Sequence, residues 1–345
     1  MKVISIRGIV LAILGVIAAS GTMRAQRAGT GTLIVANMSD ATATIIDVGS
    51  RRTLATLPTG QGPHEVAVSH DGRWAVVTNY GNREVVGNSL TVIDVEHVAV
   101  ARTIELGEYQ RPHGVAFLPG DHEIVVTSER SQAVVLVDFT TGNIIGTMPT
   151  DQRLSHMLSV AAGGERIYTT NVIDGTITEI DVASRSVQRV IEVAPMVEGI
   201  AASPSGDQVW VGSNQEKTVS VVDAASGLVV GVLEDFGFPY RIAWTPDERT
   251  AVISDPMRGE IRVVDKATRN ERTIAIPADH LSDAPEFAGS ASPEGITIST
   301  DGSHAYITLQ GRNQVAEIDL STLEIIGYMD TGVWPDGIGY SPITH

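Results

Sequence analysis

The chain has 345 residues, of which 43% are hydrophobic, 5% aromatic and 19% charged, and it contains no cysteine. This composition excludes a disordered chain, disulfide bonds, cysteine-based metal centres and a thiol nucleophile. The formal net charge of −17, from 41 acidic and 24 basic residues, argues against nucleic-acid binding because an acidic protein repels phosphate backbones.

The first 25 residues have the pattern of a secretory signal peptide. Lys2 and Arg7 supply a positive start, residues 9–19 form an apolar run, and small residues follow it. This run is shorter than the about 20 residues that a helix needs to span a bilayer. We therefore expect a periplasmic or secreted protein whose mature part, residues 26–345, has no membrane span. A retained N-terminal anchor is the alternative.

A short β-branched run that ends in aspartate recurs seven times in the rest of the chain. These residues are Asp47, Asp94, Asp138, Asp181, Asp223, Asp265 and Asp319. They are 42 to 54 residues apart, and each interval holds four short β-rich runs separated by turn residues. In the first interval the runs are expected at about 64–69, 74–79, 90–95 and 100–106. This period is typical of propeller blades, in which the aspartates cap turns.

The two ends of the repeat region are incomplete units. Residues 32–57 supply a second, third and fourth strand without a first, and residues 336–340 supply a first strand alone. The sequence therefore predicts an all-β, single-domain, seven-bladed β-propeller with four-stranded blades. Its last blade is closed by both ends of the chain, which leaves no open sheet edge at the junction.

The second strands carry a recognisable motif, which reads AVVTNY at 75–80, IVVTS at 124–128 and IYTTN at 167–171. Together with the opening strands that begin Pro63-His64, Pro112-His113-Gly114 and Pro293-Glu294-Gly295, this motif resembles the YVTN-repeat propeller family. That family includes YncE-like periplasmic proteins, surface-layer proteins and relatives of electron-transfer enzyme subunits. The resemblance implies a propeller along the whole mature chain and says little about chemistry, because one fold hosts many functions.

The opening position of the innermost strand holds chemically versatile residues in most units. Around the ring this position reads His64, His113, His156, Glu198, Tyr240, Glu294 and Asp336. In a propeller these residues lie at one mouth of the central channel. Since imidazole and carboxylate together suit Zn, Cu, Fe or Mn, the three histidines, Glu198 and Glu294 are candidate ligands of a divalent transition metal. The interpretation that we favour is a polar channel mouth whose histidines follow the repeat pattern of the family.

Further polar residues are expected on the same face, in the loops around the mouth. The predicted ligand-binding residues are Asn79, Arg111, Tyr240, Arg241, Asp336 and His280. The two arginines either hold a ligand carboxylate or pair with acidic neighbours. His280 belongs to a long insertion, residues 277–293. This insertion is either a lid over the channel or a disordered surface loop.

The sequence contains no nucleophile elbow, phosphate-binding glycine loop or dinucleotide fingerprint. We therefore expect a monomeric exported scaffold that binds a small polar ligand or a protein partner through its channel mouth and loops. The sequence leaves open whether the protein is an enzyme. One alternative is a lactonase-like metal-dependent hydrolase or lyase. A second alternative is a propeller subunit of a periplasmic redox complex.

Overall fold

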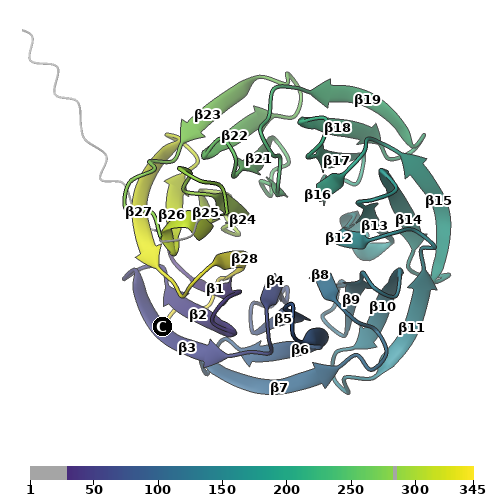
Figure 1. Cartoon of the computed structure of the whole chain (residues 1–345), viewed down its shortest axis with the longest axis horizontal. Helices are drawn as coiled ribbons and strands as arrows, with labels where there is room; N and C mark the ends of the chain where they lie inside the picture. The colour runs from purple at the N-terminus through teal and green to yellow at the C-terminus, as the bar shows by residue number, and fades with distance from the viewer. Residues whose placement is uncertain (1–28, 283–285) are drawn as a thin grey trace, which may run out of the picture.

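Seven antiparallel four-stranded sheets are arranged around a central axis in the computed structural model (Figure 1). The structure describes residues 29–282 and 286–345, so the predicted signal peptide lies outside the described residues. The seven-bladed β-propeller predicted from the repeat is confirmed. Among the described residues, no helix has the length and apolar character needed to cross a membrane.

Each blade runs from an inner strand near the axis to an outer strand at the rim (Figure 1). Blade 1 consists of β4 (Pro63–Val68), β5 (Trp74–Gly81), β6 (Val86–Asp94) and β7 (Ala99–Glu105). Blade 2 consists of β8 (Pro112–Phe117), β9 (Glu123–Ser128), β10 (Ala133–Asp138) and β11 (Ile144–Pro149). Blade 3 consists of β12 (Ser155–Val160), β13 (Arg166–Asn171), β14 (Thr176–Asp181) and β15 (Ser186–Glu192). Blade 4 consists of β16 (Val197–Ala202), β17 (Gln208–Ser213), β18 (Thr218–Asp223) and β19 (Leu228–Leu233). Blade 5 consists of β20 (Ile242–Trp244), β21 (Thr250–Asp255), β22 (Glu260–Asp265) and β23 (Glu271–Ala275). Blade 6 consists of β24 (Pro293–Ile298), β25 (His304–Leu309), β26 (Gln314–Asp319) and β27 (Glu324–Asp330). Blade 7 consists of β28 (Pro335–Ser341), β1 (Thr32–Asn37), β2 (Thr42–Asp47) and β3 (Arg52–Pro58), and two 3-10 turns, η1 (Ala162–Gly164) and η2 (Gln310–Arg312), complete the described elements.

Blade 7 combines strands from both ends of the described chain, as the incomplete end units predicted. The inner strand β28 pairs antiparallel with β1, with Tyr340 opposite Leu33 and Gly339 opposite Ile34. One inner strand is shorter than expected, because β20 begins at Ile242 rather than at Tyr240. Tyr240 and Arg241 still exchange backbone hydrogen bonds with Ser254, at 2.9 and 3.0 Å.

The hydrophobic core lies between the blades. The second and third strands are buried on both faces and are rich in Val and Ile, which suits a strand packed between two sheets. Seven clusters of buried apolar side chains each join two adjacent blades, as Val76 and Val92 of blade 1 meet Ile124 and Val126 of blade 2. The core therefore fixes the angle between neighbouring blades and the position of every inner strand.

The aspartates at the ends of the third strands cap the turns that follow, as predicted. Asp47 accepts a hydrogen bond from the backbone N–H of Ser50 at 2.9 Å, and Asp138 accepts one from Thr141 at 2.7 Å. The aspartates of the other five blades accept the equivalent bonds. Because they stabilise turns far from the channel mouth, they belong to the framework of the fold.

Candidate functional site at the channel mouth

Three histidines from neighbouring blades form a row of adjacent, tilted rings at the channel mouth, which we call the stack. His64, His113 and His156 open β4, β8 and β12, so the repeat places them side by side. The ring centroids of His64 and His113 are 4.1 Å apart, and those of His113 and His156 are 3.7 Å apart. The sequence prediction that these residues share one location therefore agrees with the structure.

His156 lies between two carboxylates. Its Nδ1 contacts Oε1 of Glu129, and its Nε2 lies 2.6 Å from Oε1 of Glu198. Burial disfavours the charged imidazolium, but the two carboxylates outweigh burial and raise the pKa of His156 to about 10. Burial likewise disfavours the Glu198 carboxylate, yet His156 and Arg241 lower its pKa to about 2. Both side chains are charged at neutral pH.

His113 is the central ring of the stack and has an unusual environment. It is 1% exposed, and neither ring nitrogen has a hydrogen-bond partner among the described residues. Burial and the positive charges of His156 and His64 hold its pKa well below the usual range. His113 is therefore a neutral imidazole whose nitrogens have no hydrogen-bond partner in the described part of the chain, which is rare for a buried polar group.

A carboxyl pair lies on the other side of His64. Asp336 forms an ion pair with Nδ1 of His64, and the charge of Asp336 outweighs burial to raise the pKa of that histidine. Glu294 is 3% exposed, and burial together with the charge of Asp336 raises its pKa well above the usual range. Glu294 is consequently a neutral acid beside an ionised one.

Arg241 connects opposite sides of the ring. Its Nη2 and Nε donate to Oε1 of Glu65 on blade 1, at 2.5 and 3.0 Å, and its Nη1 lies 3.3 Å from Oε1 of Glu198. The guanidinium also lies over the ring of Tyr240, 3.9 Å from its centroid. Of the two roles considered for Arg241, the structure shows pairing with acids. Glu65 and Arg241 also line a cavity of about 310 Å³, together with apolar side chains of the inner strands.

A larger cavity, of about 630 Å³, opens on the mouth beside the stack. It is lined by Met38, Ser39, Gln61, Gly62, His64, Tyr80, Gly81, Asn82, Arg83, Arg111 and Trp334. Arg111 lies over the ring of Tyr80 at 4.8 Å and donates to the backbone oxygens of Tyr80 and Asn82, at 3.3 and 2.8 Å. We call this space the mouth cavity.

Two predicted ligand-binding residues have contacts apart from this cluster. Asn79 is buried, and its amide bonds to the hydroxyls of Ser89 and Thr91 and to the backbone N–H of Gly60. His280 is exposed on the loop that follows β23. The ligand-binding roles of both residues stay predictions.

The residues predicted to hold a metal separate into groups. The ligand atoms of His64, Glu65 and His113 lie within 4.8 Å of one another, and so do those of His113, Glu129 and His156. Glu198 touches His156 but belongs to neither group, and neither does Glu294.

Sequence reasoning missed Glu65, Glu129 and Tyr80. Each directly follows a position that the repeat had marked, namely His64, Ser128 and Asn79. Reading the next position in every unit would have drawn attention to all three. Their mutual distances, however, depend on how the ring closes.

Two family models match the sequence. The Choice-of-anchor I domain model matches residues 115–335, which is more than half of the chain. The Cytochrome D1 heme domain model matches residues 23–153.

Two curated relatives carry the description "Uncharacterized protein YncE", one from Salmonella typhi and one from Salmonella typhimurium. Each is 22% identical over 191 residues, covering 53% of this chain and 50% of the relative. The chain thus spans about half the length of the curated relatives it matches. The predicted resemblance to YncE-like propellers is confirmed.

Solved structures share the fold at low identity. Hydrazine synthase from Kuenenia stuttgartiensis aligns with a TM-score of 0.69 and 17% identity, over 81% of this chain and 90% of that one. A functionally unknown protein from Desulfotomaculum acetoxidans aligns with a TM-score of 0.74 and 14% identity, over 90% and 99%. These similarities show that the fold is shared, and they assign no activity to this chain.

Proposed function

This chain belongs to the choice-of-anchor I domain family, and we propose that it is an exported scaffold that binds a small carboxylate-bearing ligand in its mouth cavity. Export to the periplasm or the cell exterior rests on the signal-like pattern of residues 1–25. The resemblance to YncE-like proteins supports the same location.

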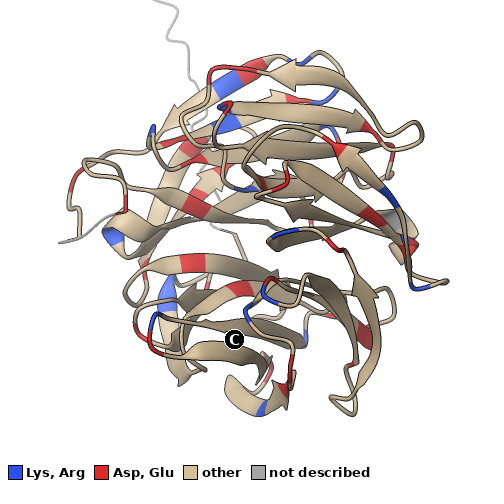
Figure 2. Cartoon of the chain, turned by 45° about the vertical axis from the view of Figure 1, so that its right-hand side comes forward, with Lys and Arg blue, Asp and Glu red and all other residues tan. Residues whose placement is uncertain are grey.

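The observation that carries this proposal is the environment of Arg111. The chain has 41 acidic residues and 24 basic ones, yet none of the described carboxylates forms an ion pair with this guanidinium. Figure 2 shows that acidic residues are spread over the blades rather than gathered at one place. Backbone oxygens and the Tyr80 ring instead hold Arg111 on the cavity wall. A fixed arginine without a protein acid suits recognition of a ligand carboxylate.

The other walls define the rest of the ligand. Tyr80 and Trp334 offer aromatic surface, and Met38 adds an apolar contact. The cavity volume of about 630 Å³ lies within the range that small-molecule sites occupy. We therefore expect a carboxylate attached to a small apolar or aromatic body.

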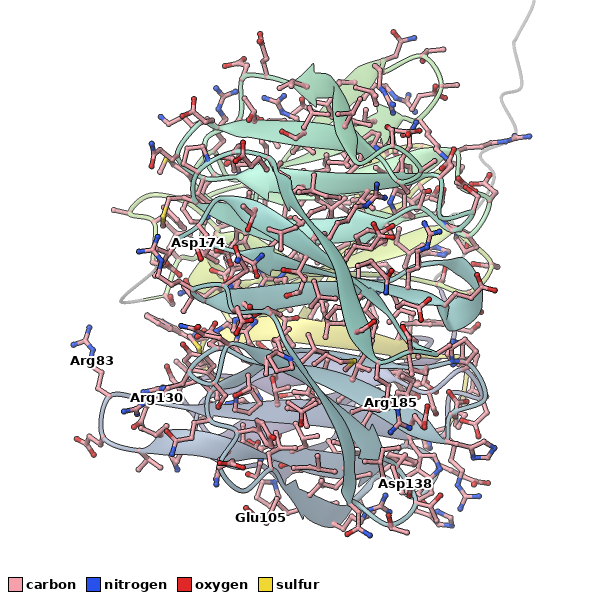
Figure 3. The ribbon with its side chains drawn as sticks, turned by 90° about the vertical axis from the view of Figure 1, so that its right-hand side faces the viewer. Arg83, Glu105, Arg130, Asp138, Asp174 and Arg185 are labelled. Atoms are coloured by element: carbon pink, nitrogen blue, oxygen red, sulfur yellow. The ribbon has the colours of Figure 1, made fainter. Side chains whose placement is uncertain are left out.

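A thermal-shift screen tests this proposal. Benzoate, phenylacetate and succinate are compared with their neutral amides, using the wild-type chain, Arg111→Gln and Arg130→Gln. Arg130 lies on the same face as Arg83 but does not line the cavity, so it is a matched control (Figure 3). We expect at least one carboxylate to raise Tm in the wild type and Arg130→Gln, and to lose this effect in Arg111→Gln. Equal shifts in both variants, or no shift with any carboxylate, would contradict the proposal.

The two groups of histidine and carboxylate ligands favour a second candidate function, a metal-dependent hydrolase or lyase. A bound divalent metal ion would supply Lewis-acid chemistry at the mouth. The chain's own residues would hold the ion, and Arg111 would contact the carboxylate that opening of a lactone ring releases. Hydrolysis of simple lactones by the zinc-loaded chain, abolished by a chelator, is the outcome that this candidate requires.

The match to the Cytochrome D1 heme domain raises the question of whether a heme fits. The matched residues include His113, but this side chain is 1% exposed and has ring neighbours at 4.1 and 3.7 Å. The mouth cavity reaches His64 and not His113. A heme therefore does not fit on His113, and a role as a subunit of a redox complex stays a prediction.

A further inference from the structure

We propose that His113, His156 and Glu129 form a mononuclear site for a divalent transition metal ion such as Zn²⁺. This site goes beyond the binding of a carboxylate ligand and does not depend on it. It specifies the ligands that the second candidate function would need.

The first argument is the chemistry of the three residues. Two imidazoles and one carboxylate are the protein ligands of many catalytic zinc sites, which keep a further position open. Here the three ligand atoms lie within 4.8 Å of one another, so one ion can contact all of them after small side-chain movements. His113 and Glu129 are buried and His156 is largely so, which limits competition from solvent.

The second argument is the unpartnered state of His113. A buried imidazole without a hydrogen-bond partner costs free energy, because water no longer satisfies its nitrogens. Both nitrogens of His113 are in this state among the described residues. Coordination of a metal would give one of these nitrogens a partner, and the stack of rings holds the imidazole in place for it.

The third argument is the support around the ligands. Histidines that bind metals usually donate their second ring N–H to a carboxylate, which orients the ring. A metal at Nδ1 would displace the Nδ1 proton of the His156 imidazolium to solvent, and the remaining Nε2–H would donate to Glu198, whose Oε1 is 2.6 Å away. The hydroxyl of Tyr80 donates to Oε2 of Glu129 at 2.6 Å and leaves Oε1 facing His156.

The alternative group of His64, Glu65 and His113 is less suited to a cation. Arg241 donates two hydrogen bonds to Glu65, so a positive charge already neutralises that carboxylate. Nδ1 of His64 is paired with Asp336, which lies outside that group, whereas Nδ1 of His156 faces Glu129, which is itself a ligand of the proposed site. These interactions direct the metal to the Glu129 side of His113.

A third group of possible ligands, Asp94, Glu96 and His97, serves as an internal control. Glu96 and His97 are exposed, and both carboxylates lie within salt-bridge distance of Arg73. This surface group lacks an unpartnered buried ligand, and we assign no metal to it.

Zinc binding to the purified chain tests the proposal. The protein is stripped with a chelator and titrated with ZnCl₂ by calorimetry, and with Co²⁺ by visible absorption. We expect one ion per chain and, for Co²⁺, the intense bands of a low-symmetry, four- or five-coordinate site. His113→Asn and Glu129→Gln should each weaken zinc binding by at least about 100-fold. Tyr80→Phe should weaken it by about 10-fold, because it removes only the support of Glu129.

Two control variants decide between the groups. Glu65→Gln and His97→Asn should bind zinc within about 3-fold of the wild type, since neither residue supplies a ligand to the proposed site. A loss of binding in Glu65→Gln but not in Glu129→Gln would overturn the assignment. So would the absence of stoichiometric binding in the wild type, or a loss confined to His97→Asn. Glu129→Gln preserves side-chain shape and keeps the test valid if His113→Asn does not fold. None of these outcomes depends on carboxylate binding, which is measured separately with Arg111→Gln.

Discussion

Two adjacent residues at the start of each inner strand have different tasks. The opening residue places a polar side chain at the channel mouth. The next position is glycine in four blades, at Gly114, Gly199, Gly295 and Gly337. A Cβ at Gly295 would lie 2.2 Å from the backbone oxygen of Asp336, so only glycine allows this approach between blades. Where the ring can hold a side chain at this position, Glu65 and Arg241 use it to bridge the channel.

The neutral state of Glu294 leads to a prediction about pH. Its pKa is raised by burial and by Asp336, so the folded protein keeps a proton that the unfolded chain releases above about pH 4.5. The contribution of Glu294 to the free energy of unfolding is therefore fully present below about pH 4.5 and is lost as pH rises toward the pKa of Glu294 in the folded protein. Glu294→Gln keeps a neutral side chain of similar shape. We expect its Tm to equal that of the wild type at pH 4 and to exceed it at pH 8.

Thermal unfolding of the metal-free proteins at several pH values measures this effect. The exposed Glu105→Gln is the control, and its difference from the wild type should be small at every pH. A Glu294→Gln variant whose stability falls with pH as steeply as that of the wild type would show that Glu294 is ionised in the fold.

At the scale of single residues, the opening residues of the inner strands could be predicted from the sequence, because a strict repeat period assigns equivalent positions in every blade. It did not reveal that Glu129 and Glu198 both bind His156. Glu129 and Glu198 belong to different blades, and their separation depends on the side-chain directions at a curved junction. The pairing of Arg241 with Glu65 across the ring could not be predicted for the same reason.

At the scale of elements, the threonine of the repeat motif joins neighbouring blades. Thr308 on β25 accepts a hydrogen bond from the N–H of Gly295 at 2.7 Å and donates one to the backbone oxygen of Asp336 at 2.8 Å. Thr127 makes the same pair of bonds with Gly114 and His156, at 2.8 and 2.5 Å. Each threonine therefore fixes the start of one inner strand against the next.

Replacing this hydroxyl should cost considerable stability. Thr308→Val leaves the N–H of Gly295 and the oxygen of Asp336 without their partner, and each loss costs about 1–3 kcal/mol in a buried site. We expect the free energy of unfolding to fall by about 2–6 kcal/mol in urea titrations. Thr103→Val, exposed on β7, should change it by less than about 0.5 kcal/mol. Similar values for the two variants would contradict the joining role of Thr308.

The strands themselves were predictable from turn residues and β-branched runs. The first-blade strands β4 to β7 lie within a few residues of their expected positions. The late start of β20 was not predicted, because the repeat assigns Tyr240 to the opening of this strand, as in the other blades. Tyr240 and Arg241 keep backbone hydrogen bonds to Ser254, so the chain still follows the path of an inner strand there.

At the scale of the whole molecule, stability depends on closure of the ring through blade 7. The inner strand β28 pairs with β1 along most of its length, and Ile338 packs with Leu33 and Val35. The oxygen of Ile343 also accepts a hydrogen bond from the hydroxyl of Thr32 at 2.7 Å. Without β28, the inner edge of β1 would be unpaired, and blades 6 and 1 would lose the strand that lies between them.

Removal of residues 331–345 should therefore prevent folding of the entire ring rather than of one blade. Each blade is packed against two neighbours, so an open ring exposes apolar surface on blades 6, 7 and 1. We expect the truncated chain to show no cooperative thermal transition, and a synthetic peptide of residues 331–345 to restore one by taking the place of β28. A chain lacking only residues 344–345 is the control and should melt within a few degrees of the wild type. If the chain that ends at residue 330 unfolded cooperatively at the wild-type Tm, closure would not be what holds the blades together, and the interfaces between blades would suffice.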